Sequence, residues 1–138
     1  MVVVDTSIAY KWIREEDTRH LSLEILWNFL SGKEIVVAPD ILLYELANAL
    51  SNKTELTNKD IQIAWDLFRD INVPLFTPTP DFMEECLKFA RKYKVTAYDA
   101  SYAVLAQQKR CNLFTSDEKF VAQVNLPFVK YLGDYTKI

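Results

Sequence analysis

The sequence is poor in the residues that build several common kinds of active site. It has one histidine, His20, and two cysteines, Cys86 and Cys111. A single histidine excludes a metal site with two histidine ligands, and any Ser/His or Cys/His scheme would have to use His20 itself. We expect His20 to be solvent-exposed and without a catalytic role. The cysteines show neither metal-ligand nor disulfide spacing, so we expect two reduced thiols that pack as small apolar side chains.

Long apolar runs are also missing. No window approaches the ~20 apolar residues of a membrane-spanning helix, and the N-terminus lacks the basic segment and apolar run of a secretion signal. The chain has 138 residues, of which 50% are hydrophobic and 25% charged, and it contains no internal repeat or low-complexity segment. These properties predict one cytoplasmic domain over residues 1–138, with no linker and no membrane association.

An excess of positive charge is absent too. The formal net charge is −3, which excludes broad, nonspecific coating of nucleic acid because that needs a strongly basic face. It does not exclude a polyanionic substrate. If four of the 19 acids hold metal ions, 15 acids remain against 16 bases, which is close to neutral.

What is present is an alternation of strand and helix patterns. The predicted strands are 2–4, 34–40, 73–77, 112–115 and 128–131, and the predicted helices are 8–14, 21–30, 41–50, 58–71, 82–92, 98–106 and 118–124. We expect a Thr/Ser cap before the first helix, Asp40 as the N-cap of helix 41–50, Gly32 as the stop of helix 21–30, and a third strand at the sheet edge because of Pro74. This order predicts an α/β fold, a parallel sheet with helices on both faces.

The first predicted strand ends at an acid. Three β-branched residues, Val2 to Val4, suit a strand buried on both faces, and Asp5, Thr6 and Ser7 follow at once. In open parallel sheets, ligands bind outside the carboxyl ends of the strands. Asp117 comes directly after strand 112–115 and Ser116, so it would lie at the same sheet edge as Asp5.

Two further acids could join them. Glu45 and Asp99 lie early on predicted helices, and all four carboxylates can meet if strands 2–4 and 112–115 are neighbours. Such a cluster repels itself unless a divalent cation is bound, and all-oxygen ligands favour Mg²⁺ or Mn²⁺, which can activate water against a phosphodiester. By spacing alone, other roles stay open: a helix N-cap for Asp5, a charge at the margin of a helix face for Glu45, a dipole partner for Asp99, and a turn residue for Asp117.

Four motifs in order resemble a known family. They are Val-Val-Asp-Thr-Ser-x-Ala-x-Lys-Trp at 3–12, Ala-Pro-Asp-x-Leu-x-x-Glu-x-x-Asn-Ala-Leu at 38–50, Thr-x-Tyr-Asp-Ala-x-Tyr-x-x-Leu-Ala at 96–106, and Leu-x-Thr-x-Asp-Glu-Lys at 113–119. Together they resemble the PIN-domain nucleases, and more narrowly the VapC-type toxins of toxin–antitoxin pairs. The resemblance implies a PIN-like three-layer α/β/α sandwich around a central parallel sheet of about five strands.

The same resemblance implies the chemistry. It implies that Asp5, Glu45, Asp99 and Asp117 form the acidic site that binds Mg²⁺ or Mn²⁺. It also implies that Thr115, Thr6 and Ser7 support the metal, the water or the phosphate by hydrogen bonds, and that Asn48 contacts the metal ligands without binding the ion itself. The implied activity is metal-dependent endoribonuclease cleavage of RNA. The implied partners are an antitoxin, which inhibits by inserting a peptide into the site, and a second copy of the chain in a homodimer.

Several other side chains have two interpretations. Lys11, Arg14, Lys53 and Lys119 lie near the predicted rim, where each could contact a phosphate or simply be solvated. The tyrosines at positions 10, 44, 98 and 102 could stack on unpaired bases or pack in the core with a hydrated hydroxyl.

Two alternative functions compete with the nuclease. One is a noncatalytic PIN-fold module that binds RNA or protein, against which the presence of all four acids counts. The other is a haloacid-dehalogenase-type phosphatase, whose first motif also places an aspartate after a strand. That chemistry needs a second acid two residues later, where this chain has Ser7.

Overall fold

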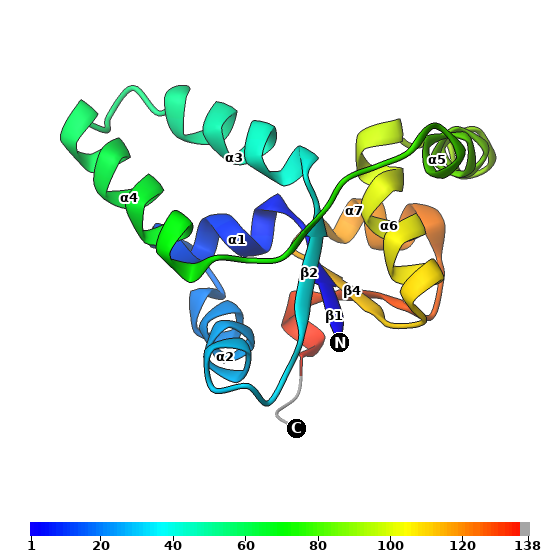
Figure 1. Ribbon diagram of the computed structural model, residues 1–138, viewed down its shortest axis with the longest axis horizontal. Helices are drawn as coiled ribbons and strands as arrows, with labels where there is room; N and C mark the ends of the chain where they lie inside the picture. Colours follow the sequence, from blue (N-terminus) through cyan, green and yellow to red (C-terminus); the bar gives the residue numbers. More distant parts are fainter. Residues whose placement is uncertain (136–138) are drawn as a thin grey trace.

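A sheet of five parallel strands forms the centre of the molecule. The computed structural model describes residues 1–135, and the strand order is β3-β2-β1-β4-β5 (Figure 1). The strands are β1 (Val2–Val4), β2 (Val36–Pro39), β3 (Leu75–Phe76), β4 (Asn112–Thr115) and β5 (Val129–Tyr131). The strands β1 and β4 are neighbours, as the site prediction required, and Val4 pairs with Phe114.

Helices cover both faces of this sheet. They are α1 (Thr6–Ile13), α2 (Arg19–Leu30), α3 (Ile41–Ser51), α4 (Asn58–Ile71), α5 (Pro80–Tyr93), α6 (Ala97–Lys109) and α7 (Glu118–Val124), followed by a 3₁₀ helix at Leu132–Asp134. Helices α1 to α4 lie to one side and α5 to α7 to the other (Figure 1). The predicted three-layer α/β/α sandwich with a central parallel sheet of about five strands is therefore confirmed.

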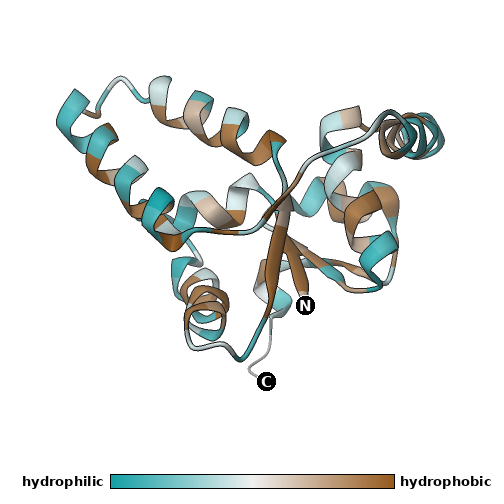
Figure 2. Cartoon of the chain, viewed as in Figure 1, coloured by the Kyte–Doolittle hydropathy of each residue, from teal (hydrophilic) through white to brown (hydrophobic). Residues whose placement is uncertain are grey.

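The core runs through the middle of the sheet. Val2 to Val4 are buried, as expected of a strand covered on both faces, and β1 and β2 form the hydrophobic centre in Figure 2. Residues 100–106 of α6 are all buried, and the small side chains of Ala100, Ala103 and Ala106 let this helix pack closely on the sheet. The outer faces of α4 and α5 are mainly hydrophilic (Figure 2), although each exposes a few apolar side chains.

Most element bounds match the predictions to within a few residues, and helix 58–71, strand 112–115 and helix 118–124 match fully. The third strand is an edge strand, as predicted, but it has only two residues, Leu75 and Phe76, which pair with Ala38 and Pro39 of β2. Helix α6 extends to Lys109, beyond the predicted 106, because its last turn is polar and carries no apolar signal. The 3₁₀ helix was not predicted.

The helix caps differ from the predictions at two places. Asp5, not Thr6 or Ser7, is the N-cap of α1, and the two hydroxyl residues form its first turn. Asp40 occupies the N-cap position of α3, but its backbone is already helical (φ −68°, ψ −13°), so its side chain accepts no capping hydrogen bond. Gly32, by contrast, adopts the predicted left-handed conformation after α2, with φ 74°.

The composition also predicted reduced cysteines, an exposed histidine and the lack of a membrane-spanning helix. Cys86 and Cys111 are both free thiols, the first buried and the second half-buried, and His20 is exposed. Across residues 1–135, none of the helices combines the length and apolarity that crossing a bilayer requires.

Candidate active site

Asp5 lies where β1 passes into α1, and both of its carboxylate oxygens are hydrogen-bonded. Oδ1 accepts from the Ile8 backbone N–H at 3.3 Å and from the Ser7 hydroxyl at 2.5 Å, while Oδ2 accepts from the Thr115 hydroxyl at 2.5 Å. Withdrawal from water raises the pKa of Asp5 to about 6, against the lowering effect of these hydrogen bonds. The N-cap role left open by the sequence is therefore real, and it coexists with a place in an acidic site.

Hydrogen bonds connect the carboxyl end of β4 to the carboxyl end of β1. The buried Thr115 hydroxyl that donates to Asp5 also accepts from the Asp117 backbone N–H at 3.0 Å. The Ser7 hydroxyl accepts from the Ser116 backbone N–H at 2.9 Å. Asp117 in turn caps α7, because its Oδ1 accepts from the Phe120 N–H at 2.9 Å. Thr115 and Ser7 thus hold Asp5 and Asp117 at one edge of the sheet.

Glu45 reaches the same edge from α3. Its Oε1 accepts from the Thr6 hydroxyl at 3.0 Å and from the Tyr102 hydroxyl at 2.5 Å. Burial and the Glu45 carboxylate both raise the pKa of Tyr102, so the phenol stays protonated and remains a donor. The sequence interpretation of Tyr102 as a stacking or core residue missed this role. The signal that could have found it is the three-residue spacing from Asp99, which places both on one face of α6.

Asp99 lies in the first turn of α6, and its environment disfavours charge. Burial is the main cause of its raised pKa, and the carboxylates of Glu45 and Asp117 add to it. Asp60 occupies the equivalent position in α4, yet its pKa is lowered, because its carboxylate accepts from the Thr57 N–H in a capping box. The same residue at the same helical position thus titrates in opposite directions, and only Asp99 faces other carboxylates.

Asp5, Glu45, Asp99 and Asp117, called here the acidic cluster, are coupled by charge without touching. Glu45 raises the pKa of both Asp5 and Asp99, and Asp117 raises that of Asp99. In the described part of the chain, however, no three acid, histidine or cysteine side chains lie close enough to hold one ion between them. A set of separated hard oxygen donors fits Mg²⁺ or Mn²⁺ that keeps several waters, rather than a closed protein cage.

A groove opens beside two of these acids. It has a volume of about 510 Å³ and is lined by Lys94, Val95, Thr96, Asp99, Asp117, Lys119, Phe120 and Gln123. Lys119, which from the sequence could contact a phosphate or simply be solvated, therefore lies next to the acidic cluster. Lys94 was not predicted as a contact, because it belongs to a turn between helices and not to any of the four motifs.

Other predicted contact residues point elsewhere. Lys11 is buried, and its ammonium group bonds to Glu16 Oε2 at 3.0 Å and to the Asp17 carbonyl at 2.8 Å, so it is a structural cation and does not reach the rim. Arg14 lies where its charge acts on Asp60, at the start of α4. Asn48 is exposed and its side chain accepts from Asn52, one turn further along α3, at 3.3 Å.

The sheet and its helices are similar to several solved structures. One is PAE2754 from Pyrobaculum aerophilum, with 21% sequence identity and a TM-score of 0.70 over 96% of this chain and 89% of that chain. Another is a toxin–antitoxin complex from Klebsiella pneumoniae, with 17% identity and a TM-score of 0.72 over 96% of this chain and 98% of that chain. A third is Mycobacterium tuberculosis VapC20, described as a sarcin–ricin loop cleaving toxin, with 17% identity and a TM-score of 0.69 over 94% of this chain and 97% of that chain. At these identities the likeness concerns the fold.

The sequence itself supplies the family. A search of curated proteins gave no significant match. The family model of the PIN domain matches residues 2–124, a span that contains all four residues of the acidic cluster and every strand except β5. The chain therefore belongs to the PIN domain family.

Proposed function

We propose that this protein is a Mg²⁺- or Mn²⁺-dependent endoribonuclease and the toxin of a toxin–antitoxin pair. One observation supports the proposal: within a PIN fold, four carboxylates from four parts of the chain act on one another by charge near the carboxyl ends of β1 and β4. The pKa values of Asp5 and Asp99 are raised there, so the cluster is poorly neutralised by the protein alone. An excess of unneutralised carboxylate is what a divalent cation relieves.

Glu45, Asp99 and Asp117 would hold the ion, together with Asp5. When bound, the ion stabilises charge that develops on a phosphodiester and lowers the pKa of a water molecule. The protein's own contribution is orientation. Ser7 and Thr115 fix the two oxygens of Asp5, while Thr6 and Tyr102 fix Oε1 of Glu45. Asp5 and Glu45 are thereby each held by a donor from another element, which fixes the geometry of these two acids before the ion binds.

The acidic cluster also suits the proposed antitoxin. A peptide that carries a basic side chain into the groove would neutralise Asp99 and Asp117 and occupy the place of the ion. Two structures with this fold, from Klebsiella pneumoniae and Neisseria gonorrhoeae, are described as a toxin–antitoxin complex and as FitAcB. We further propose that a small open reading frame next to this one encodes the partner, and that the two proteins purify together when they are coexpressed.

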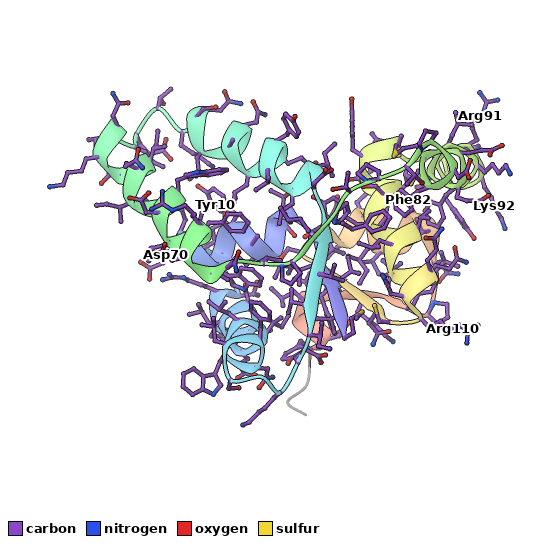
Figure 3. The ribbon with its side chains drawn as sticks, in the orientation of Figure 1. Tyr10, Asp70, Phe82, Arg91, Lys92 and Arg110 are labelled. Carbon is purple, nitrogen blue, oxygen red and sulfur yellow. The ribbon has the colours of Figure 1, made fainter. Side chains whose placement is uncertain are left out.

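A homodimer is the second proposed assembly. An apolar pocket of about 180 Å³ lies among α3, α5 and α6, and its rim includes Tyr44, Met83 and Tyr98. Tyr44 is 77% exposed and Tyr98 61% exposed, which is unusual for neighbouring large side chains. The ring of Phe82 lines this pocket, turned inward from α5 (Figure 3). A second copy of the chain would cover this surface.

The experiment that tests the nuclease is incubation of the purified protein with total cellular RNA in Mg²⁺, in Mn²⁺ and in EDTA. We expect discrete fragments in both metals and none in EDTA. Asp5→Asn should abolish the fragments, because it removes one charge from the cluster while an amide can keep part of the hydrogen bonding.

The outcomes separate the candidate functions. Fragments that persist in EDTA or in Asp5→Asn would refute the metal-dependent mechanism. RNA binding without cleavage under all conditions would instead support the noncatalytic module. The phosphatase is disfavoured by the geometry, because Ser7 occupies the position of its second acid and donates to Asp5.

A further inference from the structure

The groove beside Asp99 and Asp117 is lined by two lysines. Lys94 comes from the turn between α5 and α6, and Lys119 from the first turn of α7. Both residues are exposed. Over residues 1–135 neither ammonium group forms an ion pair, although two carboxylates line the same groove. Both cations are therefore available to an anionic ligand.

The two sides of the groove are fixed to each other. The Gln123 side chain of α7 donates to the carbonyl of Tyr93, the last residue of α5, at 3.0 Å. Lys94 directly follows Tyr93, so this hydrogen bond sets the position of Lys94 relative to α7. Two more cations, Arg91 and Lys92, stand on the outer side of α5 next to this turn (Figure 3). These two cations do not line the groove.

An RNA strand can bind beside the acidic cluster only if nearby cations offset the repulsion of its phosphates. The groove begins at the acidic cluster, which repels a polyanion, and the whole chain carries a net charge of −3. A nucleic-acid strand that approaches Asp99 and Asp117 must therefore be held by nearby lysines. The groove, with a volume of about 510 Å³, has room for a short stretch of one strand.

We propose that this groove holds the sugar–phosphate backbone of a single RNA strand next to the bond that is cut, with Lys94 and Lys119 each contacting a phosphate. The inference rests on the proposed nuclease function and adds to it the path of the substrate. It assigns Lys94 as a substrate-binding residue, outside the motifs that mark the acidic cluster.

The backbone of Lys94 makes a clean test possible. Lys94 is the C-cap of α5 and has a φ of 57°, a left-handed conformation that glycine adopts more readily than lysine. Lys94→Gly therefore removes the charge without straining the fold. Arg110 is the C-cap of α6 with a φ of 54°, and it lies at the amino end of β4, away from the acidic cluster. Arg110→Gly is thus a matched control with the same loss of charge and the same backbone change.

The measurement is fluorescence anisotropy of a short labelled single-stranded RNA in EDTA, where no divalent ion supports cleavage, over a series of salt concentrations. We expect Lys94→Gly to bind several-fold more weakly than the wild type and to lower the slope of log affinity against log salt by about 0.7, the value for one phosphate contact. Arg110→Gly should bind like the wild type. In Mg²⁺, Lys94→Gly should raise KM and leave kcat nearly unchanged.

The results distinguish this inference from the nuclease proposal. The inference is overturned if the wild type fails to bind the RNA, or if Lys94→Gly and Arg110→Gly bind it with the same affinity. Either result overturns it even when cleavage is observed. If Lys94→Gly alone weakens binding but the wild type cleaves no RNA, the groove assignment stands and the nuclease proposal fails. Thermal melting of both variants should show no loss of stability, which excludes misfolding as the cause of weaker binding.

Discussion

Asp5 is held where its own charge is unfavourable. Its pKa is raised from 3.8 to about 6, chiefly because burial removes water from the carboxylate. Between these two values the folded state binds a proton more tightly than the unfolded state does. The free energy of unfolding therefore falls as pH rises through this window, and the cost is fully present above pH 6. A metal ion bound at the cluster would offset this cost.

Asp5→Asn should consequently stabilise the metal-free protein at pH 7.5. Since Asp5 is partly exposed, we discount the pKa shift and expect a gain on the order of 2 kcal/mol, with little difference between variant and wild type at pH 4. Urea unfolding in EDTA at the two pH values measures this. Mn²⁺ should then stabilise the wild type more than the variant. A variant less stable than the wild type at pH 7.5 would show that the hydrogen bonds to Asp5 outweigh its desolvation.

At this scale the sequence named the four acids and, through the family resemblance, the hydroxyl residues Thr6, Ser7 and Thr115 beside them, but it did not name Tyr102 as a partner of Glu45. The acids follow strands or begin helices, and those positions are visible in the chain. The Tyr102 hydroxyl that fixes Glu45 comes from 57 residues away, and no local pattern links the two. The reason differs for Lys11, whose partners Glu16 and Asp17 are close in sequence but lie on a loop whose path the hydrophobic pattern does not specify.

Two helix starts offer a comparison at the scale of elements. In both α4 and α6 a threonine N-cap accepts from an aspartate N–H three residues on, Thr57 from Asp60 at 3.1 Å and Thr96 from Asp99 at 3.0 Å. In α4 the bond is reciprocated by the Asp60 carboxylate, and the whole cap lies at the surface. In α6 the cap positions an acid of the cluster. The same capping hydrogen bond therefore stabilises the helix alone in α4, and in α6 it also positions an acid of the cluster.

Thr57→Ala and Thr96→Ala should separate these roles. Each removes one capping bond, and we expect each to lower the free energy of unfolding by about 1 kcal/mol. Only Thr96→Ala should also lower RNA cleavage, because the first turn that carries Asp99 loosens. Urea unfolding and the cleavage assay measure the two effects. Equal cleavage by both variants would mean that the α6 cap does not position Asp99.

Elements with strong internal patterns were also the best predicted. Helix α4 was placed to the residue because its amphipathic stripe lies between a threonine cap and Asn72, which takes the left-handed conformation at its end. The edge strand β3 was predicted too long, because apolar residues from Val73 to Phe76 show burial but not how many of them find a partner strand. Asp40 was predicted as a side-chain cap since its residue type favours that role, but the chain enters α3 already helical there.

For the whole molecule, the proposed homodimer can be tested through the apolar pocket. Met83 lines this pocket and is 37% exposed, so Met83→Glu would place a charge in the proposed interface without disturbing the core. Ile63 on α4 is 52% exposed and lies outside the pocket, which makes Ile63→Glu the matched control. Sedimentation velocity should give dimers for the wild type and Ile63→Glu and monomers for Met83→Glu. A monomeric wild type, or a dimeric Met83→Glu, would contradict this interface.

The strand order has a consequence for the order of events during synthesis. Asp5 and Glu45 are translated early, whereas Asp99, Thr115 and Asp117 come late, and β4 must pair with β1 across most of the chain before the four acids share an edge. A nascent chain on the ribosome therefore holds at most three of the four acids, without Asp117, until β4 has emerged. If the protein is the toxin we propose, it stays harmless to the RNA of the ribosome that makes it until its fold is nearly complete.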